Sequence, residues 1–294
     1  MSSDLHLHSV FSDGTYSPEE LAGYAVRYGL GVVALTDHDS VEGCERMAAA
    51  CLRRGLEFVP GTELTAELED RGLHLLGYYV DTCYPPLLHA LARFQEVRQN
   101  RIREMVGRLN RLNVPLAAET VFALANCRAP GRPHVARALV QGGFCTNLDE
   151  AFERYLKKRR PAWVPKLKMS ALEAIDLIHH AGGVAVLAHP GLNCVDDLIP
   201  DLVAAGMDGV ECFHTKHSTA TTEHYLLVAE QYSLLVTGGS DCHGMSKGKP
   251  LIGTIRLPCD YLPPLKARRC LCRPGPAQAT PALARAEAAL VVFH

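Results

Sequence analysis

Histidines and carboxylates recur in this 294-residue chain in short clusters beside predicted strands. The first cluster is Asp4-Leu5-His6-Leu7-His8, and Asp13 follows it in the next loop. Residues two apart on a strand face the same side, so His6 and His8 can reach one ion or two adjacent ions. Neutral imidazoles and carboxylates are the ligands that borderline divalent metals bind. The spacing therefore predicts a metal site.

Further candidates follow other apolar runs of the chain. His38 comes after a run ending at Leu35, Glu63 after one ending at Gly61, and His189 after one ending at Ala188. Sites in parallel α/β folds are built at the carboxyl ends of strands. A single histidine in such a place is more often a hydrogen-bonded core residue, so the prediction depends on the whole set. The predicted metal ligands are His6, His8, Asp13, His38, Glu63, His74, His189, Asp241 and His243.

This set contains nitrogen and oxygen donors but no thiolate. Cys242 lies between Asp241 and His243, and at strand spacing it faces the opposite side. A site without thiolate fits Mn²⁺, Fe²⁺ or Zn²⁺ in an open centre better than a closed structural zinc site.

The composition limits the class of protein. The chain is 48% hydrophobic, enough for a full core, and its net charge of −2 gives no global basic field for duplex nucleic acid. Its eleven cysteines form no Cys-x-x-Cys pair, and no apolar signal segment or membrane-spanning run is present. We therefore expect a reduced, cytoplasmic protein with no membrane association and no obligate protein partner.

Strand and helix patterns alternate along most of the chain, which is typical of an α/β fold with parallel strands. Ser17-Pro18-Glu19-Glu20 is a capping box that predicts the start of a helix. The expected strands are 5–9, 32–36, 57–61, 73–80, 184–188, 209–213 and 234–238; the expected helices are 17–28, 41–54, 171–181, 196–205 and 219–231.

The alternation breaks after Pro85-Pro86, where residues 87–160 read as mostly helical. We predict a helical insertion domain over 87–160 and a discontinuous barrel over 1–86 and 161–265. The segment 266–294 is rich in Pro, Ala and Arg without a clear period, which predicts a poorly ordered tail. The alternative there is a short surface helix over 281–290.

Taken together, these clusters resemble the motifs of the PHP (polymerase and histidinol phosphatase) family. The matching residues are Asp-Leu-His6-Leu-His8, Asp13, Thr-Asp-His38, Glu63, His74, His189-Pro and Asp241-Cys-His243. The resemblance implies a distorted (β/α)7 barrel with two or three divalent ions, Mn²⁺ first and Zn²⁺, Fe²⁺ or Mg²⁺ as alternatives. It implies three ligand groups: His6, His8, Glu63 and Asp241; Glu63, His74 and His189; and Asp13, His38 and His243.

The helical insertion is similar to that of the family branch that contains nucleoside 3′,5′-bisphosphate phosphatases and RNA-trimming relatives. The resemblance implies substrate contacts from Arg98, Arg101, Arg132 and His134, with His217 from the barrel. Arg98 and Arg101 lie one helical turn apart, and Arg132 begins a helix, where phosphate binds well. The alternative is that arginines on a long helix form a solvated face.

We expect His217, Arg132 and Asp13 to act in catalysis, with His217 protonating the leaving group and His214 as a competing candidate. The predicted reaction is hydrolysis of a nucleoside 3′,5′-bisphosphate to the 5′-monophosphate by a hydroxide that the metal activates. One alternative is a 5′-to-3′ exonuclease on short RNA, for which basic residues flank Trp163: Lys157, Lys158, Arg159, Arg160, Lys166 and Lys168. The other is a non-catalytic metal-binding module.

Overall fold

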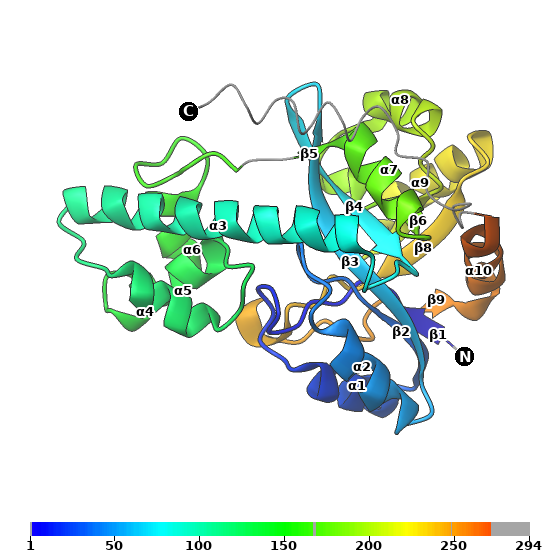
Figure 1. The fold of residues 1–294 in the computed structure, drawn as a ribbon, viewed down its shortest axis with the longest axis horizontal. Coiled ribbons are helices and arrows are strands. Elements are labelled where there is room, and N and C mark those ends of the chain that lie inside the picture. Colours follow the sequence, from blue (N-terminus) through cyan, green and yellow to red (C-terminus); the bar gives the residue numbers. More distant parts are fainter. Residues whose placement is uncertain (1, 167–168, 248, 272–294) are drawn as a thin grey trace.

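A nearly closed barrel sheet forms the centre of the molecule in this computed structural model, which describes residues 2–166, 169–247 and 249–271 (Figure 1). Among these residues the sheet has nine strands, in the order β8-β7-β6-β4-β3-β2-β1-β9, with β5 beside β3. Their bounds are β1 Ser2–Asp4, β2 Leu30–Leu35, β3 Glu57–Leu68, β4 Arg71–Tyr78, β5 Met169–Ser170, β6 Val184–Leu187, β7 Gly209–His214, β8 Leu235–Gly239 and β9 Leu257–Pro258.

The chain just after β1 closes the barrel. β1 ends at Asp4, before the strand predicted over 5–9 begins, but the following residues run alongside β8 and the loop after it. The amide of Leu5 donates to the carbonyl of Gly238 (3.1 Å), and Leu7 forms a parallel bridge with Cys242. Leu5 and Leu7 are fully buried in the core, so His6 and His8 face the other side, as the alternation predicts.

The expectation of parallel strands throughout is wrong for β4. β4 runs antiparallel to both β3 and β6, and β3 continues to Leu68, well past the predicted end at Gly61. A two-residue turn at Glu69-Asp70, with both residues at positive φ, joins β3 to β4 as a hairpin. This turn lacks the Asn-Gly or Asp-Gly pair that usually marks such hairpins, so local sequence does not predict it.

Helices pack around the outside of the sheet. They are α1 Pro18–Arg27, α2 Cys44–Leu52, α7 Ala171–His180, α8 Ile199–Ala204, α9 Thr219–Gln231 and α10 Leu262–Leu271. The predicted capping box of α1 is present: the Glu20 amide donates to the Ser17 hydroxyl, and the Ser17 amide donates to the Glu20 carboxylate. An apolar cluster that includes Leu75, Ile175 and Val210 joins the sheet to α7, α8 and α9.

A group of helices projects from one side of the barrel (Figure 1). It consists of α3 Pro85–Arg111, α4 Ala118–Ala125, α5 Arg132–Gln141 and α6 Leu148–Ala151, and a π-helical turn follows over Phe152–Leu156. The group has its own apolar core around Ile102, Leu109, Val135 and Leu139. Apart from the first two residues of α3, these helices lie within the insertion predicted over 87–160, and the domain limits stay a prediction.

The C-terminal boundary differs from the expected one. The tail is predicted to begin at 266, but α10 continues to Leu271, with Leu262 and Leu265 buried against the barrel. The rest of the predicted tail, 272–294, with its alternative helix over 281–290, lies outside the described residues, as does Lys168. In the described part of the chain, no helix is both long and apolar enough to cross a bilayer.

Candidate metal centre

Glu63 lies at the centre of a group of five histidines at one rim of the barrel. One carboxylate oxygen, Oε1, is 2.5 Å from His74 Nδ1 and 3.1 Å from His189 Nε2. The other, Oε2, faces three ring nitrogens, at 3.3 Å from His6, 3.1 Å from His8 and 3.0 Å from His38. Burial disfavours the charge of Glu63, but His38, His74 and His6 outweigh it and hold its pKa well below the usual value.

His6 and His8 point into this group together, as their spacing predicts. Their Nε2 atoms are 3.1 Å apart, and both rings are fully buried. Asp241 Oδ1 lies 3.2 Å from His8 Nε2 and 3.6 Å from His6 Nε2. Asp241 has a positive φ of 52°, so it leaves β8 in a turn and does not continue the strand.

Asp13 and His243 complete the group on the side of His8 and His38. Asp13 Oδ1 lies 3.2 Å from His243 Nε2 and 4.0 Å from His38 Nε2. Burial opposes its charge, but His243 and His38 keep the pKa of Asp13 well below its usual value. The Nδ1–H of His243 donates to the Asp241 carbonyl (2.9 Å), so in the neutral ring the lone pair lies on Nε2, the atom that faces Asp13.

All nine predicted ligands therefore come together. They form four overlapping sets whose donor atoms lie within 4.8 Å of one another: His8, Asp13, His38 and His243; His6, His8 and Asp241; His6, Glu63 and His189; and His38, Glu63 and His74. The donors are imidazole nitrogens and carboxylate oxygens, and the carboxylate of Glu63 belongs to two of these sets. This chemistry fits two or three neighbouring divalent ions bridged by a carboxylate.

The direction of β4 explains the position of His74. The amino end of this antiparallel strand lies at the same rim as the carboxyl ends of the parallel strands. His74 pairs in register with Thr65, two residues after Glu63 on β3. A histidine near the start of a strand thus joins ligands that follow strand ends.

Glu211 supports the centre from behind, and sequence reasoning missed it. This fully buried carboxylate on β7 accepts from His6 Nδ1 (3.0 Å), and it also accepts from the His189 amide (2.8 Å). It therefore fixes the ring of His6 with Nε2 directed at the ligand group. The sequence does contain a signal: Glu211 lies between the apolar residues Val210 and Cys212, which are buried. A carboxylate in such a strand needs a partner for its charge.

His214 has a related position beside Asp241. Its Nδ1 accepts the amide hydrogen of Lys216 (3.1 Å), so its proton lies on Nε2. That atom lies 3.6 Å from Asp241 Oδ2, and the ring is 2% exposed. His214 was considered as a proton donor to substrate, but this geometry directs it at Asp241.

His217 lies beside His214, with the two ring centroids 5.3 Å apart. Its Nδ1–H donates to the carbonyl of Cys212 (2.9 Å), and its buried Nε2 faces the backbone of Gly191. Burial lowers the pKa of His217. With its proton on Nδ1 the neutral ring presents an acceptor at Nε2, and it would have to gain a second proton there to act as an acid. Protonation of a leaving group by His217 therefore stays a prediction.

Basic side chains from the insertion gather next to the metal-ligand group. Arg98 donates to Asp39 Oδ2 from both Nε (2.8 Å) and Nη2 (2.5 Å), and Arg101 donates to the carbonyl of Val164. Burial, with Arg132 and Arg98 nearby, lowers the pKa of Arg101 to about 9. Three guanidinium groups thus lie together, with Asp39 bound directly to one of them, and such an excess of positive charge favours an anion.

His134 and Arg137 connect α5 to the same region. The Gly131 amide donates to His134 Nδ1 (3.0 Å), so Nε2 carries the proton, and burial lowers the pKa of His134 to about 4. Neutral His134 can therefore donate one hydrogen bond. Arg137, which was not among the predicted site residues, donates to the backbone carbonyl of Asp13 (2.7 Å). This hydrogen bond connects the insertion to the loop that carries Asp13.

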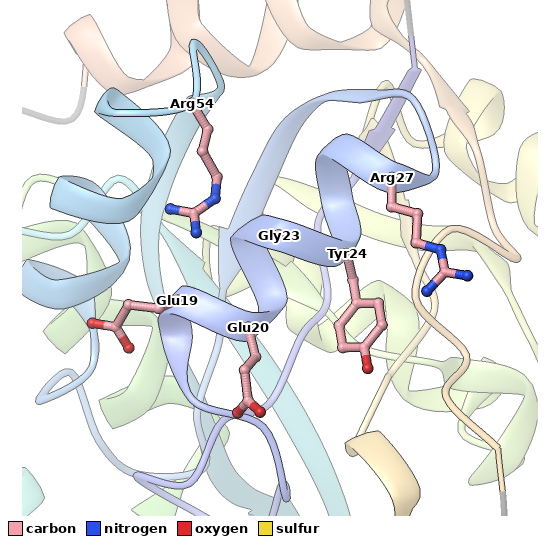
Figure 2. Close-up of a pocket in the computed structure, with 6 residues that line it drawn as sticks. All are labelled: Glu19, Glu20, Gly23, Tyr24, Arg27 and Arg54. Carbon is pink, nitrogen blue, oxygen red and sulfur yellow. The ribbon is translucent and has the colours of Figure 1, made fainter.

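A separate hollow of about 410 Å³ lies on the outer surface of α1 (Figure 2). Arg54 reaches toward it from the end of α2, while Tyr24 and Arg27 project from α1. Glu19 and Glu20 also line it, and both are held by other partners, Arg46 and the cap of α1. None of the nine predicted ligands lines this hollow, so the metal-ligand group remains the candidate site.

Comparisons with known proteins agree with this geometry. The family model for the PHP domain matches residues 4–158. A 5′-3′ exoribonuclease from Haemophilus influenzae is 36% identical over 248 residues, covering 82% of this chain and 89% of the relative. A 3′,5′-nucleoside bisphosphate phosphatase from Chromobacterium violaceum is 33% identical over 279 residues, covering 92% of this chain and 94% of the relative.

A solved structure shares the fold. A protein from Bifidobacterium adolescentis, described as a metal-dependent phosphoesterase, superposes with a TM-score of 0.84 at 33% identity. The match covers 90% of this chain and 96% of that protein. The similarity thus extends over the barrel and the helical group.

Proposed function

Because this chain belongs to the PHP domain family, we propose that its substrate is a nucleoside 3′,5′-bisphosphate, cleaved to the 5′-monophosphate and phosphate. The protein is a metal-dependent hydrolase of phosphoester bonds, which sets aside the non-catalytic alternative. The observation that supports the substrate proposal is the pairing of two groups: nine side chains that could hold metal ions, and the arginines Arg98, Arg101 and Arg132 beside them.

The two groups suit two phosphates of one small molecule. The scissile phosphoryl group would lie at the metal-ligand group, where bound divalent ions supply a Lewis acid that activates water and neutralises phosphoryl charge. The other phosphate would lie against Arg101 and Arg132, which can each offer parallel N–H donors to phosphate oxygens. Neutral His134 adds one donor at its Nε2.

Each ligand has a proposed role. His6, His8, Glu63 and Asp241 would hold one ion, and Glu63, His74 and His189 would hold a second. Asp13, His38 and His243 would hold a third. The lowered pKa of Asp13 suits a ligand, because an ionised, weakly basic carboxylate binds cations readily but accepts protons poorly.

We also propose Mn²⁺ as the metal and the cytoplasm as the location. The mixture of imidazole and carboxylate donors supports Mn²⁺, with Zn²⁺, Fe²⁺ and Mg²⁺ as alternatives. Nine cysteines, from Cys44 to Cys259, are free thiols, which suits a reducing compartment.

Phosphate release from adenosine 3′,5′-bisphosphate in the presence of Mn²⁺ tests the proposal. We expect release from this compound and much less from adenosine 5′-monophosphate or histidinol phosphate. The variants His6→Ala and Asp241→Ala should lose bound metal and activity together, which ties turnover to the centre. Absence of phosphate release from all three compounds would contradict the proposal.

A second candidate, a 5′-to-3′ exonuclease on short RNA, is favoured by the relative from H. influenzae. The basic segment that would guide a strand is partly neutralised, because Lys157 and Arg160 both pair with Glu153. Trp163 is half-buried, and its carbonyl accepts from Arg108. Stepwise release of mononucleotides from a 5′-phosphorylated oligonucleotide, at a rate above that for the bisphosphate, would favour this candidate.

A further inference from the structure

Lys166 lies between the metal-ligand group and the buried arginines. Its ammonium group contacts the hydroxyl of Thr65, and it lies 3.9 Å from Asp39 Oδ2. Thr65 is two residues after Glu63 on β3 and pairs in register with His74 on β4. Since residues two apart on a strand share a face and lie about 6.6 Å apart, Lys166 is anchored one step away from the central carboxylate.

The carboxylate nearest to Lys166 is already engaged. Asp39 is fully buried and accepts two hydrogen bonds from Arg98 as well as the amide hydrogen of Thr65 (3.0 Å). Its single negative charge therefore faces both Arg98 and Lys166, and Arg101 and Arg132 lie just beyond. Among Asp39, Arg98, Lys166, Arg101 and Arg132, positive charge therefore exceeds negative charge.

Lys166 remains within reach of a ligand. Its side chain is 21% exposed, whereas that of Arg98 is 7% exposed. Burial and the charge of Arg98 lower the pKa of Lys166 to about 7, as expected where a cation lacks sufficient compensation. An anionic group bound here would supply that compensation.

We propose that Lys166 determines substrate specificity by binding the second phosphate of a substrate whose first phosphate lies at the metal-ligand group. This inference rests on the proposed function. The ammonium is a compact cation with three donors, so it can contact a phosphate oxygen while staying bonded to Thr65. Together with Arg101 and Arg132 it would form a continuous cationic wall leading away from the metals.

A comparison of two nucleotides tests the role of Lys166. Adenosine 3′,5′-bisphosphate carries both phosphates, while adenosine 3′-monophosphate carries only the scissile one. In Lys166→Met, kcat/KM for the bisphosphate should fall about 10-fold to 100-fold, the usual cost of a lost charged hydrogen bond. The kcat/KM for the monophosphate should not change. Lys166→Arg should retain part of the preference for the bisphosphate over the monophosphate.

Lys266→Met is the matched control, because Lys266 pairs with Glu57 on the surface away from the centre. It should leave both substrates unaffected. Metal content and thermal unfolding of each variant show whether the centre and the fold are intact. Equal losses on both substrates would place Lys166 at the scissile phosphate, and no loss on either would make it only a counterion for Asp39; each result overturns the inference.

The failure of the proposed function has a different signature. In that case the manganese-loaded wild-type protein would release phosphate from neither nucleotide. Calorimetric titration of the same two nucleotides needs no turnover and still tests Lys166. The inference requires that Lys166→Met weaken binding of the bisphosphate selectively, and equal affinities for wild type and variant would overturn it.

Discussion

At the scale of single residues, Glu63 is the carboxylate that contacts the most predicted ligands. One buried carboxylate faces five imidazoles, and each oxygen serves a different subset. A carboxylate in this position can bridge two cations, and without them it favours the protonated form of His6. Burial opposes protonation of His6, but Glu211 and Glu63 outweigh it and raise the pKa of His6 well above the usual value.

Replacing Glu211 tests how much the support behind His6 contributes. Glu211→Gln preserves shape but removes the charge that orients His6 and makes its Nε2 more basic. We expect Mn²⁺ affinity to fall about 10-fold to 100-fold, the usual effect of losing such a partner. Competition with a chelating dye measures this affinity directly.

Asp208→Asn is a matched control for this substitution. Asp208 is also a buried carboxylate that holds a histidine, with Oδ2 2.7 Å from His179 Nε2 and accepting the Ala185 amide hydrogen (2.9 Å). It should lower stability without changing metal affinity. Equal affinities for Glu211→Gln and wild type would show that Glu211 is only a structural residue.

Arg132 separates substrate binding from metal binding. Its guanidinium lies over the ring of Phe152 and contributes to the positive charge around Arg101. Arg132→Ala should raise KM for the bisphosphate while bound metal stays at the wild-type level, with a cost of about 1.5–3 kcal/mol for the lost charged hydrogen bonds. Steady-state kinetics with elemental analysis checks both parts, and wild-type kinetics would show that the phosphate pocket lies elsewhere.

At the scale of elements, the sequence predicted the helices and strands that have clear local signals. Ser17 and Glu20 mark the start of α1 because the capping interactions are local. The β3–β4 hairpin was missed, since β3 is predicted to stop at Gly61 and its turn has no glycine pair. The direction of β4 depends on its pairing with β3 and β6, which no local pattern encodes.

Gly239 is the point where β8 and the chain after β1 approach most closely. A Cβ atom on Gly239 would lie 2.3 Å from the backbone nitrogen of His6, so the two segments would have to separate. Gly239→Ala should destabilise the protein by about 1–3 kcal/mol and displace His6 from the ligand group. The midpoint of denaturant unfolding and the affinity for Mn²⁺ should therefore both fall.

Gly23→Ala is the control for that prediction. Gly23 lies inside α1, and a Cβ atom there meets nothing within 4 Å. Alanine in a helix interior should stabilise the protein by roughly 0.5–1 kcal/mol and leave metal binding unchanged. If both glycine variants bound Mn²⁺ like wild type, close packing at Gly239 would not position His6.

At the scale of the whole molecule, the convergence of the nine candidate ligands could be predicted, but the side chains that support them could not. Nine histidines and carboxylates with motif spacing were identified from the sequence, and the barrel brings all of them together. Arg98 was expected to contact substrate, but two of its donors bind Asp39. Glu211 was missed because its importance comes from burial behind the ligands, which depends on the packing of β7.

The ligand group joins segments from residue 6 to residue 243, so bound metal should stabilise the whole fold. A ligand present at 100 times its Kd adds about 2.7 kcal/mol to the free energy of unfolding. At roughly 2–4 °C per kcal/mol, the midpoint of thermal unfolding should rise by about 5–10 °C with Mn²⁺. Calorimetry with and without metal measures the shift, and His6→Ala should abolish it.

This stabilisation should also grow as the pH rises. Burial opposes protonation of His8, but Asp241 and Glu63 outweigh it and raise the pKa of His8 to about 9. The metal-free protein therefore gains stability from protonated His8 below the unfolded pKa of about 6.5 and loses this gain as the pH rises through about 9. Mn²⁺ needs the neutral ring, so its binding releases a proton, and its apparent affinity should fall about tenfold per pH unit below 9. Titration calorimetry in buffers of different ionisation enthalpy counts the released protons. A metal-induced shift of the midpoint that is equal at pH 6.5 and pH 8.5 would contradict this linkage.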